Sequence, residues 1–261
     1  MVYEQIRIGL LGTLEVTCTS RLTPDRRGVQ ITAAKLRQVL TMLAANANTM
    51  VSTSQLIDEL WPSNPPNSVK TIVQTYVYQL RKLFGEASQS AGGGKLLTTR
   101  LGGYLLAVPR ENVDIFQFQE LMARGRAALR HGKPGHAADL LGKALGLWRG
   151  IALADVNAGP NLQGLAVYLE EQRLEAVSAR IEADLANNRH GELVGELRSL
   201  ITTHRLHESF YIRLMQALHG CGRRGEALTV YHQLRSTLAQ DLGLEPSGEA
   251  QRLQHEILKS G

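Results

Sequence analysis

The residues best suited to chemistry occupy one stretch, VKTIVQTYVYQLRKLFG, at positions 69–85. Apolar residues recur there at spacings of three and four, which is typical of the buried face of a helix: Val69, Val73, Val77, Leu80 and Phe84. The opposite side carries amide, hydroxyl and basic side chains. Such groups supply the hydrogen bonds and positive charge by which proteins bind base edges and phosphates. The stretch therefore predicts either a solvated helix face or a surface that binds nucleic acid.

On the second interpretation, the predicted DNA contacts of this helix are Lys70, Thr71, Gln74, Thr75, Tyr78, Arg81 and Lys82. Gln74 and Thr75 can hydrogen-bond to bases or phosphates. Arg81 and Lys82 lie a turn or more later and suit contacts with the DNA backbone. Lys70 lies near the helix N-terminus, which is itself a phosphate-binding position. The helix is therefore expected to enter the major groove of a duplex.

A second candidate contact lies in LLTTRLGGYLLAV, where β-branched and aromatic residues flank a Gly-Gly turn. This pattern predicts a β-hairpin that turns at Gly102 and Gly103. Thr98, Thr99 and Arg100 precede the turn and are predicted to touch DNA. An arginine at a hairpin tip can enter a narrow minor groove or bind phosphates, although an ordinary exposed arginine gives the same sequence pattern.

A further hairpin and two further helices must position this helix and its hairpin. Alternating apolar residues in 5–18 predict a hairpin around a Gly-Thr turn. Helices are expected over 32–46, with Thr32 as a possible N-cap, and in MVSTSQLIDELWP, with Ser52 or Thr53 as the N-cap and Pro62 ending the second helix. Gly85 is expected to end the third helix. Strands, three helices and a hairpin, in that order, predict a winged helix-turn-helix whose third helix faces DNA. Lys35 and Arg37 on the first helix are weaker candidates for contacts with the DNA backbone.

The net charge of +5 is unevenly distributed along the chain. Residues 1–110 contain 12 Lys and Arg against 6 Asp and Glu, whereas residues 111–261 contain 17 against 18. The excess positive charge therefore belongs to the N-terminal part, which favours an anionic partner for that part. High solubility is the alternative explanation for the same asymmetry.

The second half of the chain has a helical pattern throughout and contains a repeat. NRHGELVGELRSLI and GRRGEALTVYHQLR superimpose with a shift of 34 residues, which aligns Gly191-Glu192 with Gly225-Glu226. Thirty-four residues is the period of tetratricopeptide helix pairs. A more divergent copy surrounds Gly135. We expect an all-α domain of stacked helix pairs, with a non-repeating helical bundle as the alternative.

Other functions find little support in the residues. The AGGGK run at 91–95 lacks the spacing of a phosphate-binding loop, and His204 and His207 lack companions for a metal site. We expect no catalytic residues, no cofactor and no metal. The N-terminus lacks a signal-peptide pattern and no segment is apolar enough to span a membrane, so a cytoplasmic, nucleoid-associated protein is expected. The alternatives left open are a protein scaffold and a small-molecule site near Trp148 and Tyr168.

Three segments together resemble the Streptomyces antibiotic regulatory protein (SARP) family: TIVQTYVYQLRKLFG, TTRLGGYLL and ALTVYHQLRSTLAQDLGLEPSGE. The most distinctive piece is DLGLEP, at Asp241–Pro246. The resemblance implies a mainly α fold with a small β component. It also implies an OmpR-type winged helix over 1–110 and a tetratricopeptide-like bacterial transcriptional activation domain over 111–261, as in the short members of the family.

The resemblance further implies a function and its partners. Family members activate transcription of secondary-metabolite gene clusters, bind direct repeats in promoter DNA and recruit RNA polymerase holoenzyme through its sigma and alpha subunits. A head-to-tail homodimer on DNA is expected, with repeats spaced by about one helical turn. By the same resemblance, a weaker polymerase contact falls in the loop PSNPPNS, at Ser63, Asn64, Pro65 and Asn67.

Overall fold

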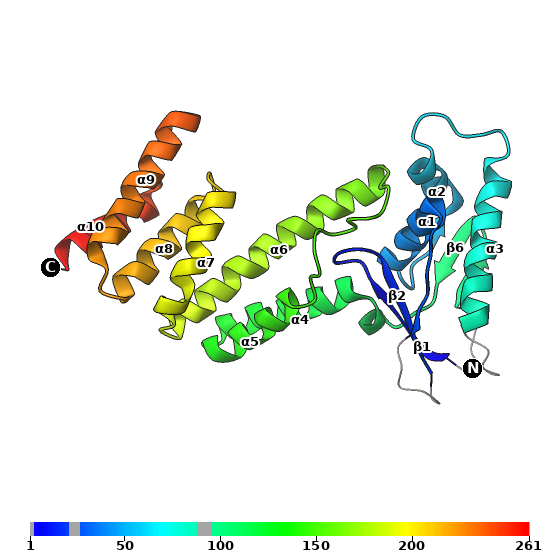
Figure 1. The fold of residues 1–261 in the computed structure, drawn as a ribbon, viewed down its shortest axis with the longest axis horizontal. Coiled ribbons are helices and arrows are strands. Elements are labelled where there is room, and N and C mark those ends of the chain that lie inside the picture. The colour runs from blue at the N-terminus through cyan, green and yellow to red at the C-terminus, as the bar shows by residue number, and fades with distance from the viewer. Residues whose placement is uncertain (1–2, 21–26, 88–95, 261) are drawn as a thin grey trace. The chain divides into compact units, whose positions relative to one another are not determined.

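The computed structural model describes residues 3–20, 27–87 and 96–260, and shows a mainly helical chain with two small sheets (Figure 1). The strands are β1 (Tyr3–Gly9), β2 (Glu15–Ser20), β3 (Arg27–Gly28), β4 (Val51–Ser52), β5 (Leu97–Arg100) and β6 (Gly103–Leu106). The helices are α1 (Ala34–Ala45), α2 (Thr53–Leu60), α3 (Val69–Ala87), α4 (Asp114–Arg130), α5 (Pro134–Leu145), α6 (Pro160–Ala186), α7 (His190–Thr203), α8 (Glu208–Gly220), α9 (Arg224–Leu242) and α10 (Gly248–Lys259). None of the described helices is long and apolar enough to cross a bilayer.

Tertiary contacts divide the chain into two compact units. Unit 1 comprises residues 1–122 and 143–174, and unit 2 comprises residues 123–142 and 175–261. Helices α4 and α6 therefore each contribute residues to both units. As a consequence, residues 143–174 pack with the N-terminal strands and helices even though they lie far along the chain.

Unit 1 contains the winged helix in the expected element order. Helices α1, α2 and α3 pack on one another, and the β5–β6 hairpin packs beside them (Figure 1). The apolar stripe of α3 forms part of this core, since Val73, Val77, Leu80 and Phe84 are buried. Burial of one stripe fixes the rotation of α3 about its axis and turns its polar side outwards. The predicted combination of a mainly helical fold with a small β component is thus confirmed.

Two helix ends differ from expectation. Helix α1 begins after Ala33, whose carbonyl accepts the N–H of Arg37, so Thr32 lies one residue too early to be the N-cap. Helix α3 continues to Ala87, so Gly85 does not end it; a glycine costs only about 1 kcal/mol inside a helix. Of the two predicted caps of α2, the structure uses Ser52, which forms a reciprocal capping box with Gln55.

The strands form two separate three-stranded sheets. Strands β1 and β2 pair antiparallel as the predicted hairpin, and β3 extends the sheet on the β2 side. The wing has strand order β4-β6-β5, all antiparallel. Gly102 adopts φ +83° at the tip, and a Cβ on Gly103 would lie 2.3 Å from the carbonyl oxygen of Val51. Glycine at both positions is therefore a requirement of the turn and of the close β4–β6 approach.

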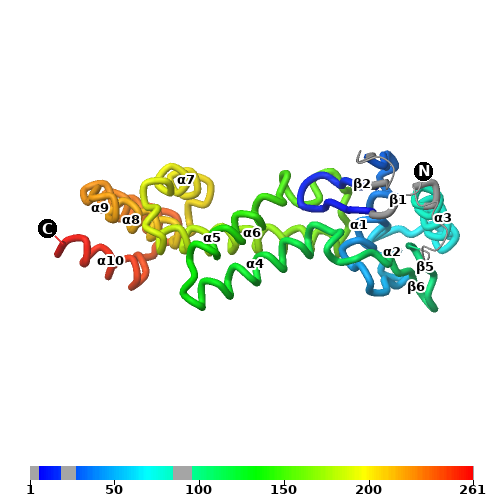
Figure 2. Tube along the Cα trace, turned by 90° about the horizontal axis from the view of Figure 1, so that it is seen from below, coloured from blue at the N-terminus to red at the C-terminus, as the bar shows by residue number. Residues whose placement is uncertain are grey.

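Unit 2 carries the repeat that the sequence predicts. Helix α7 packs against α8, which packs against α9 (Figure 2). The residues before α7 and α9 have the same backbone geometry 34 positions apart, because Asn188 (φ 59°) and Gly222 (φ 75°) both adopt left-handed conformations. Gly132 (φ 67°), between α4 and α5, has this conformation too. At all three turns the next N–H bonds to a carbonyl five residues earlier, so the divergent copy in the 130s belongs to the same series.

Candidate nucleic-acid interface

The exposed side of α3 gathers the predicted helix contacts on one surface. Lys70, Thr71, Gln74, Thr75, Tyr78 and Lys82 are all exposed, whereas Arg81 is half-buried at the edge of the apolar stripe. The side chain of Tyr78 is 67 % exposed, an unusual position for a large aromatic ring in a core-forming helix. Its ring therefore offers an apolar surface and a hydroxyl on the polar side of α3.

Some of these side chains are already partly engaged within the helix. The hydroxyl of Thr75 donates to the carbonyl oxygen of Thr71 at 2.9 Å, which leaves the lone pairs of the Thr75 oxygen as acceptors. Gln79 is also exposed and lies one turn after Thr75. Its spacing of four from Thr75 places both residues on the same side of the helix, a relationship that the sequence already contains.

The wing places a second group of predicted contacts near α3. Arg100 is exposed at the end of β5, and Thr98 donates a weak 3.4 Å hydrogen bond across the hairpin to the carbonyl oxygen of Leu105. Leu101 forms the tip and is 99 % exposed. Sequence patterns gave no signal for Leu101, because an apolar residue in a hairpin normally indicates core. Proteins that bind the minor groove use arginine to read it and often insert an apolar side chain such as leucine between base steps.

Arg81, one of the predicted DNA contacts, joins α3 to strand β5 of the wing. The guanidinium of Arg81 donates from Nε to the carbonyl oxygen of Leu97 at 3.0 Å and from Nη2 to the hydroxyl of Thr99 at 2.8 Å. Arg81 and Thr99 therefore lie together, and α3 and β5 are connected through them.

The weaker candidates on α1 are engaged within the protein. The ammonium of Lys35 donates to the carbonyl oxygen of Leu60 and lies 5.3 Å from the ring centroid of Trp61. Arg37 forms an ion pair with Asp155. In both cases the charge contributes to contacts inside unit 1.

The loop between α2 and α3 is exposed at every predicted polymerase-contact position, namely Ser63, Asn64, Pro65 and Asn67.

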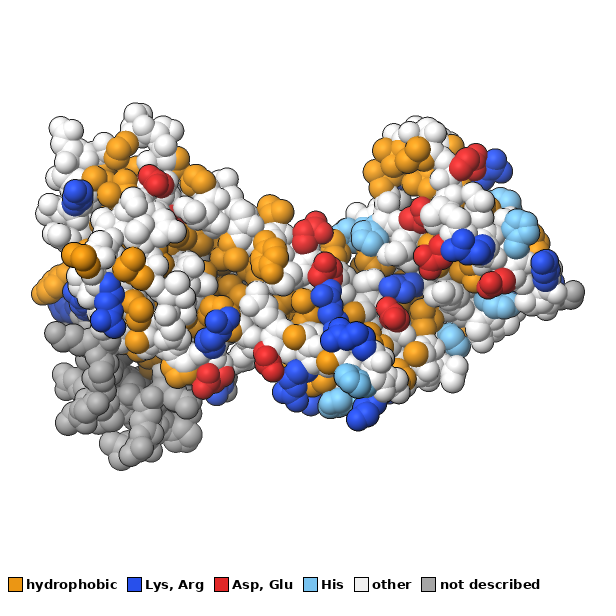
Figure 3. Space-filling view, turned by 180° about the vertical axis from the view of Figure 1, so that it is seen from behind, with side chains coloured by type: hydrophobic (Ala, Val, Ile, Leu, Met, Phe, Trp, Pro, Cys, Tyr) orange, Lys and Arg blue, Asp and Glu red, His pale blue; other side chains and the backbone are white. Residues whose placement is uncertain are grey.

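Within the described residues, no group of three or more His, Cys, Asp or Glu side chains is arranged to hold a metal ion. On the face shown in Figure 3, acidic and basic side chains are interspersed over α7–α10.

The β1–β2 hairpin is held to the start of α4 by a carboxylate. Asp114 accepts the backbone N–H groups of Leu10 and Leu11 at 2.8 and 3.0 Å, and its Oδ2 lies 3.1 Å from Arg149. Burial raises the pKa of Asp114, while the two N–H groups and the guanidinium of Arg149 act in the opposite direction. Leu10 and Leu11 lie 104 and 103 positions from Asp114, and Arg149 lies 35 positions from it, so the sequence alone offered no sign of these contacts.

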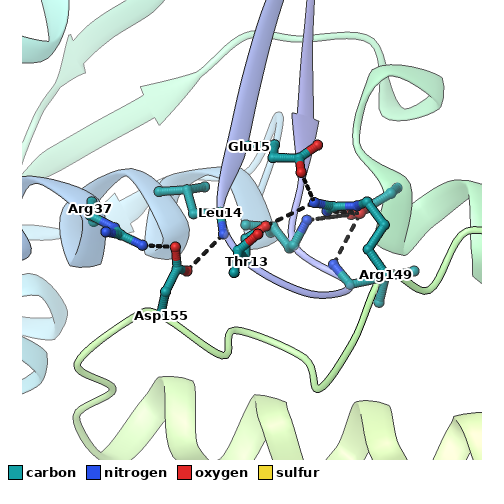
Figure 4. Close-up of polar contacts among 9 residues, drawn as sticks. Thr13, Leu14, Glu15, Arg37, Arg149 and Asp155 are labelled. Atoms are coloured by element: carbon teal, nitrogen blue, oxygen red, sulfur yellow. Dashed lines mark hydrogen bonds and ion pairs between the residues drawn. The ribbon is translucent and has the colours of Figure 1, made fainter. Parts of the chain in front are cut away.

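Arg149 and Asp155 connect this junction to the segment between α5 and α6 (Figure 4). Arg149 bonds to the carbonyl oxygen of Thr13 at 3.0 Å and pairs with Glu15 at 2.8 Å. Asp155 accepts the N–H of Leu14 at 2.8 Å and also pairs with Arg37. The hairpin turn is thus enclosed by polar contacts from residues 149–155, which explains why this segment belongs to unit 1.

Comparisons with known proteins agree with this architecture. Residues 27–106 match the family described as transcriptional regulatory protein, C terminal, and residues 113–258 match the bacterial transcriptional activator domain. The chain is 39 % identical to the regulatory protein DnrI of Streptomyces peucetius, covering 95 % of this chain and 93 % of DnrI. It is 34 % identical to the transcriptional regulator RedD of Streptomyces coelicolor, covering 97 % of this chain and 70 % of RedD.

A solved structure gives the same result. Mycobacterium tuberculosis EmbR, in complex with a low affinity phosphopeptide, superimposes with a TM-score of 0.89 at 31 % identity, covering 98 % of this chain and 65 % of that chain. These families and relatives are transcription regulators, which confirms that the chain is not an enzyme. The chain therefore belongs to the Streptomyces antibiotic regulatory protein family of DNA-binding transcriptional activators, with an OmpR-type DNA-binding domain followed by a bacterial transcriptional activator domain.

Proposed function

We propose that the protein activates a secondary-metabolite gene cluster by binding direct repeats in its promoter with α3 in the major groove. The main support is the exposed face of α3, where amide, hydroxyl and basic side chains lie opposite the buried side chains of Val73, Val77 and Leu80. A major groove accepts a helix of this kind, and its base edges offer the donors and acceptors that Gln74 and Tyr78 complement.

The individual contacts follow from where the side chains stand. Lys70 and Thr71 lie in the first turn of α3, where backbone N–H groups also favour a phosphate. Gln74, Thr75 and Tyr78 lie in the middle of the helix and read base edges. Lys82 contacts the phosphate backbone one turn further on. Arg100 at the wing reaches the adjoining minor groove or its phosphates.

Direct repeats impose a geometry on the complex. Two protomers bound to repeats sit head to tail, so both recognition helices face one side of the duplex when the repeats are spaced by about 10–11 bp. The complex is then a homodimer on DNA, whatever the state of the free protein.

Activation requires a second contact, with RNA polymerase holoenzyme and its sigma and alpha subunits. We assign DNA binding to residues 1–110 and activation to residues 111–261. The exposed loop with Ser63, Asn64, Pro65 and Asn67 adds a polymerase contact from the DNA-binding side. Its prolines make it a stiff, outward-facing segment that suits such a role.

A salt titration of binding to random genomic fragments tests the proposal, with the bound DNA sequenced at the highest salt concentration that retains complexes. Enrichment of a direct repeat with a period near one helical turn is expected. Binding without enrichment, or no binding at moderate salt, would contradict sequence-specific recognition. In that case unit 2 would be tested as a protein-binding scaffold instead.

A further inference from the structure

We infer that Arg81 is a positioning residue that fixes the wing relative to the recognition helix, an inference that rests on the proposed function. The sequence alone suggested a phosphate contact for Arg81. The structure shows its guanidinium directed at β5, where it donates to the carbonyl oxygen of Leu97 and the hydroxyl of Thr99 at 3.0 and 2.8 Å. Two of its three nitrogens are therefore committed within the protein.

The place of Arg81 on α3 explains this direction. Arg81 follows Leu80 and lies one turn after Val77, and both of these residues are buried. It therefore borders the apolar stripe, is half-buried, and points along the helix surface towards the hairpin. Lys70, Gln74 and Tyr78, by contrast, are exposed.

The wing needs such a connection on its β5 side. Its central strand β6 is held by pairing with β4, by the bond from the Thr53 N–H to the carbonyl oxygen of Gly102, and by the bond from the Asn48 N–H to that of Leu106. Strand β5 is at the edge of the sheet and pairs with β6 on one side. The planar fork of Arg81 bonds to two residues of this edge strand at once, which a single point charge does less well.

The bond between Arg81 and Thr99 also affects the position of Arg100, a predicted DNA contact. Arg100 comes directly after Thr99, so a bond that fixes Thr99 also fixes the distance between α3 and the wing tip. A recognition helix in the major groove and an arginine beside it bind together only when that distance matches the DNA. Arg81 thus acts on DNA through Arg100.

Arg81→Lys separates this role from a phosphate contact, because the charge stays and the planar fork is lost. In the free protein, amide hydrogen exchange at Leu97–Arg100 is expected to become roughly tenfold faster. Arg110→Lys is the matched control, since Arg110 is an exposed arginine whose guanidinium lies 4.1 Å from the Phe116 ring centroid; it should leave exchange in β5 unchanged. Unchanged exchange in Arg81→Lys would overturn the inference.

Binding to the enriched repeat provides the second measurement. Arg81→Lys and Arg100→Ala should each lower affinity by about tenfold, as for one lost charged contact. Each should also remove the hydroxyl-radical footprint of the wing while leaving that of the helix. In the Arg100→Ala background, Arg81→Lys should have less than about a twofold further effect.

Independent effects that multiply, or a wild-type footprint in Arg81→Lys, would show that Arg81 does not act through Arg100. A destabilised fold by itself would lower the unfolding temperature without removing the wing footprint selectively. If the wild-type protein enriches no repeat, the proposed function fails, and hydrogen exchange in the free protein still decides whether Arg81 holds the wing.

Discussion

Glu59 at the end of α2 binds the start of α6 at Gly159, a hundred positions later in the chain. The N–H of Gly159 donates to Oε1 of Glu59 at 2.6 Å, and those of Asn161 and Leu162 donate to Oε2 at 2.8 and 3.2 Å. Glu59 is only 1 % exposed, and its backbone carbonyl accepts the amide of Gln38 at 2.7 Å. A carboxylate at this position satisfies free N–H groups and complements the dipole of a 27-residue helix.

The contact between Glu59 and Gly159 leaves no room for a side chain, and this gives the first prediction. A Cβ on Gly159 would lie 2.1 Å from the backbone oxygen of Glu59. Gly159→Ala should therefore lower the free energy of unfolding by about 1–3 kcal/mol, as overpacking does. Denaturant unfolding followed by tryptophan fluorescence measures this, since Trp61 lies two residues after Glu59.

Gly164→Ala is the control for that experiment. Gly164 is exposed within α6, and a Cβ there meets nothing within 4 Å. Alanine is the better helix former, so this substitution should raise the free energy of unfolding by about 0.5–1 kcal/mol. Equal effects of the two substitutions would mean that the junction at Glu59 is looser than the structure shows.

The second prediction concerns a fragment that ends at residue 110. Such a fragment lacks Asp114, Arg149 and residues 159–162, so the N–H groups of Leu10 and Leu11 and the carboxylate of Glu59 lose their partners. Each unsatisfied buried group costs about 1–3 kcal/mol. We expect weak DNA binding, a lowered unfolding temperature and no activation in an in vitro transcription assay. Full activation by this fragment would remove any role for the helical half.

A third prediction distinguishes base reading from phosphate binding on α3. Gln74→Ala should cost about 1–3 kcal/mol at the preferred base pair and relax discrimination at one or two positions. Lys70→Ala should instead weaken binding equally across sequences and reduce the salt slope by about 1. Binding titrations against the enriched site and its single-base variants, at several salt concentrations, separate the two patterns. Loss of discrimination in Lys70→Ala would reverse the assignment.

The α2–α3 loop provides the fourth prediction. Replacing Asn64 and Asn67 together with alanine should leave DNA affinity unchanged, because both residues are exposed and precede α3. Transcription by purified holoenzyme should fall severalfold if the loop touches polymerase. Comparing transcription at saturating protein with affinity from binding titrations is the test. Unchanged transcription would confine the polymerase contact to the helical half.

The fifth prediction follows from the two cysteines. Burial raises the pKa of Cys18 to about 11, whereas Cys221 is exposed. At pH 8 only about one Cys18 thiol in a thousand is ionised, and the thiolate is the reactive form. Iodoacetamide should therefore label Cys221 in the native protein and Cys18 only after unfolding, with Cys221→Ser as the control. Rapid native labelling of Cys18 would indicate that the β1–β2 hairpin opens readily.

Much of the fold could be predicted from the sequence, because its signals are local. The spacing of Val73, Val77 and Leu80 defined the buried side of α3, and Gly102 marked the wing turn. The 34-residue period was visible in the sequence because Gly191-Glu192 recurs as Gly225-Glu226, and the structure places left-handed residues at the equivalent turns, Asn188 and Gly222. The helix ends were less predictable, since several nearby residues compete to cap or extend a helix.

The candidate site was partly predictable for the same reason. A helical period alone shows that Lys70, Gln74 and Tyr78 share one side. It does not show that Arg81 turns towards the wing, since that depends on where β5 lies in space.

By itself, then, the sequence determined the elements, their order and their polar and apolar faces, which depend on neighbouring residues. Only the tertiary structure decided the partners of Arg81, Asp114 and Glu59. A charged side chain can bond to any donor or acceptor within reach, and residues between 16 and about 100 positions away come within reach only when the core has packed. The assignment of residues 143–174 to unit 1 was decided in the same way, by long-range contacts that leave no periodic trace in the chain.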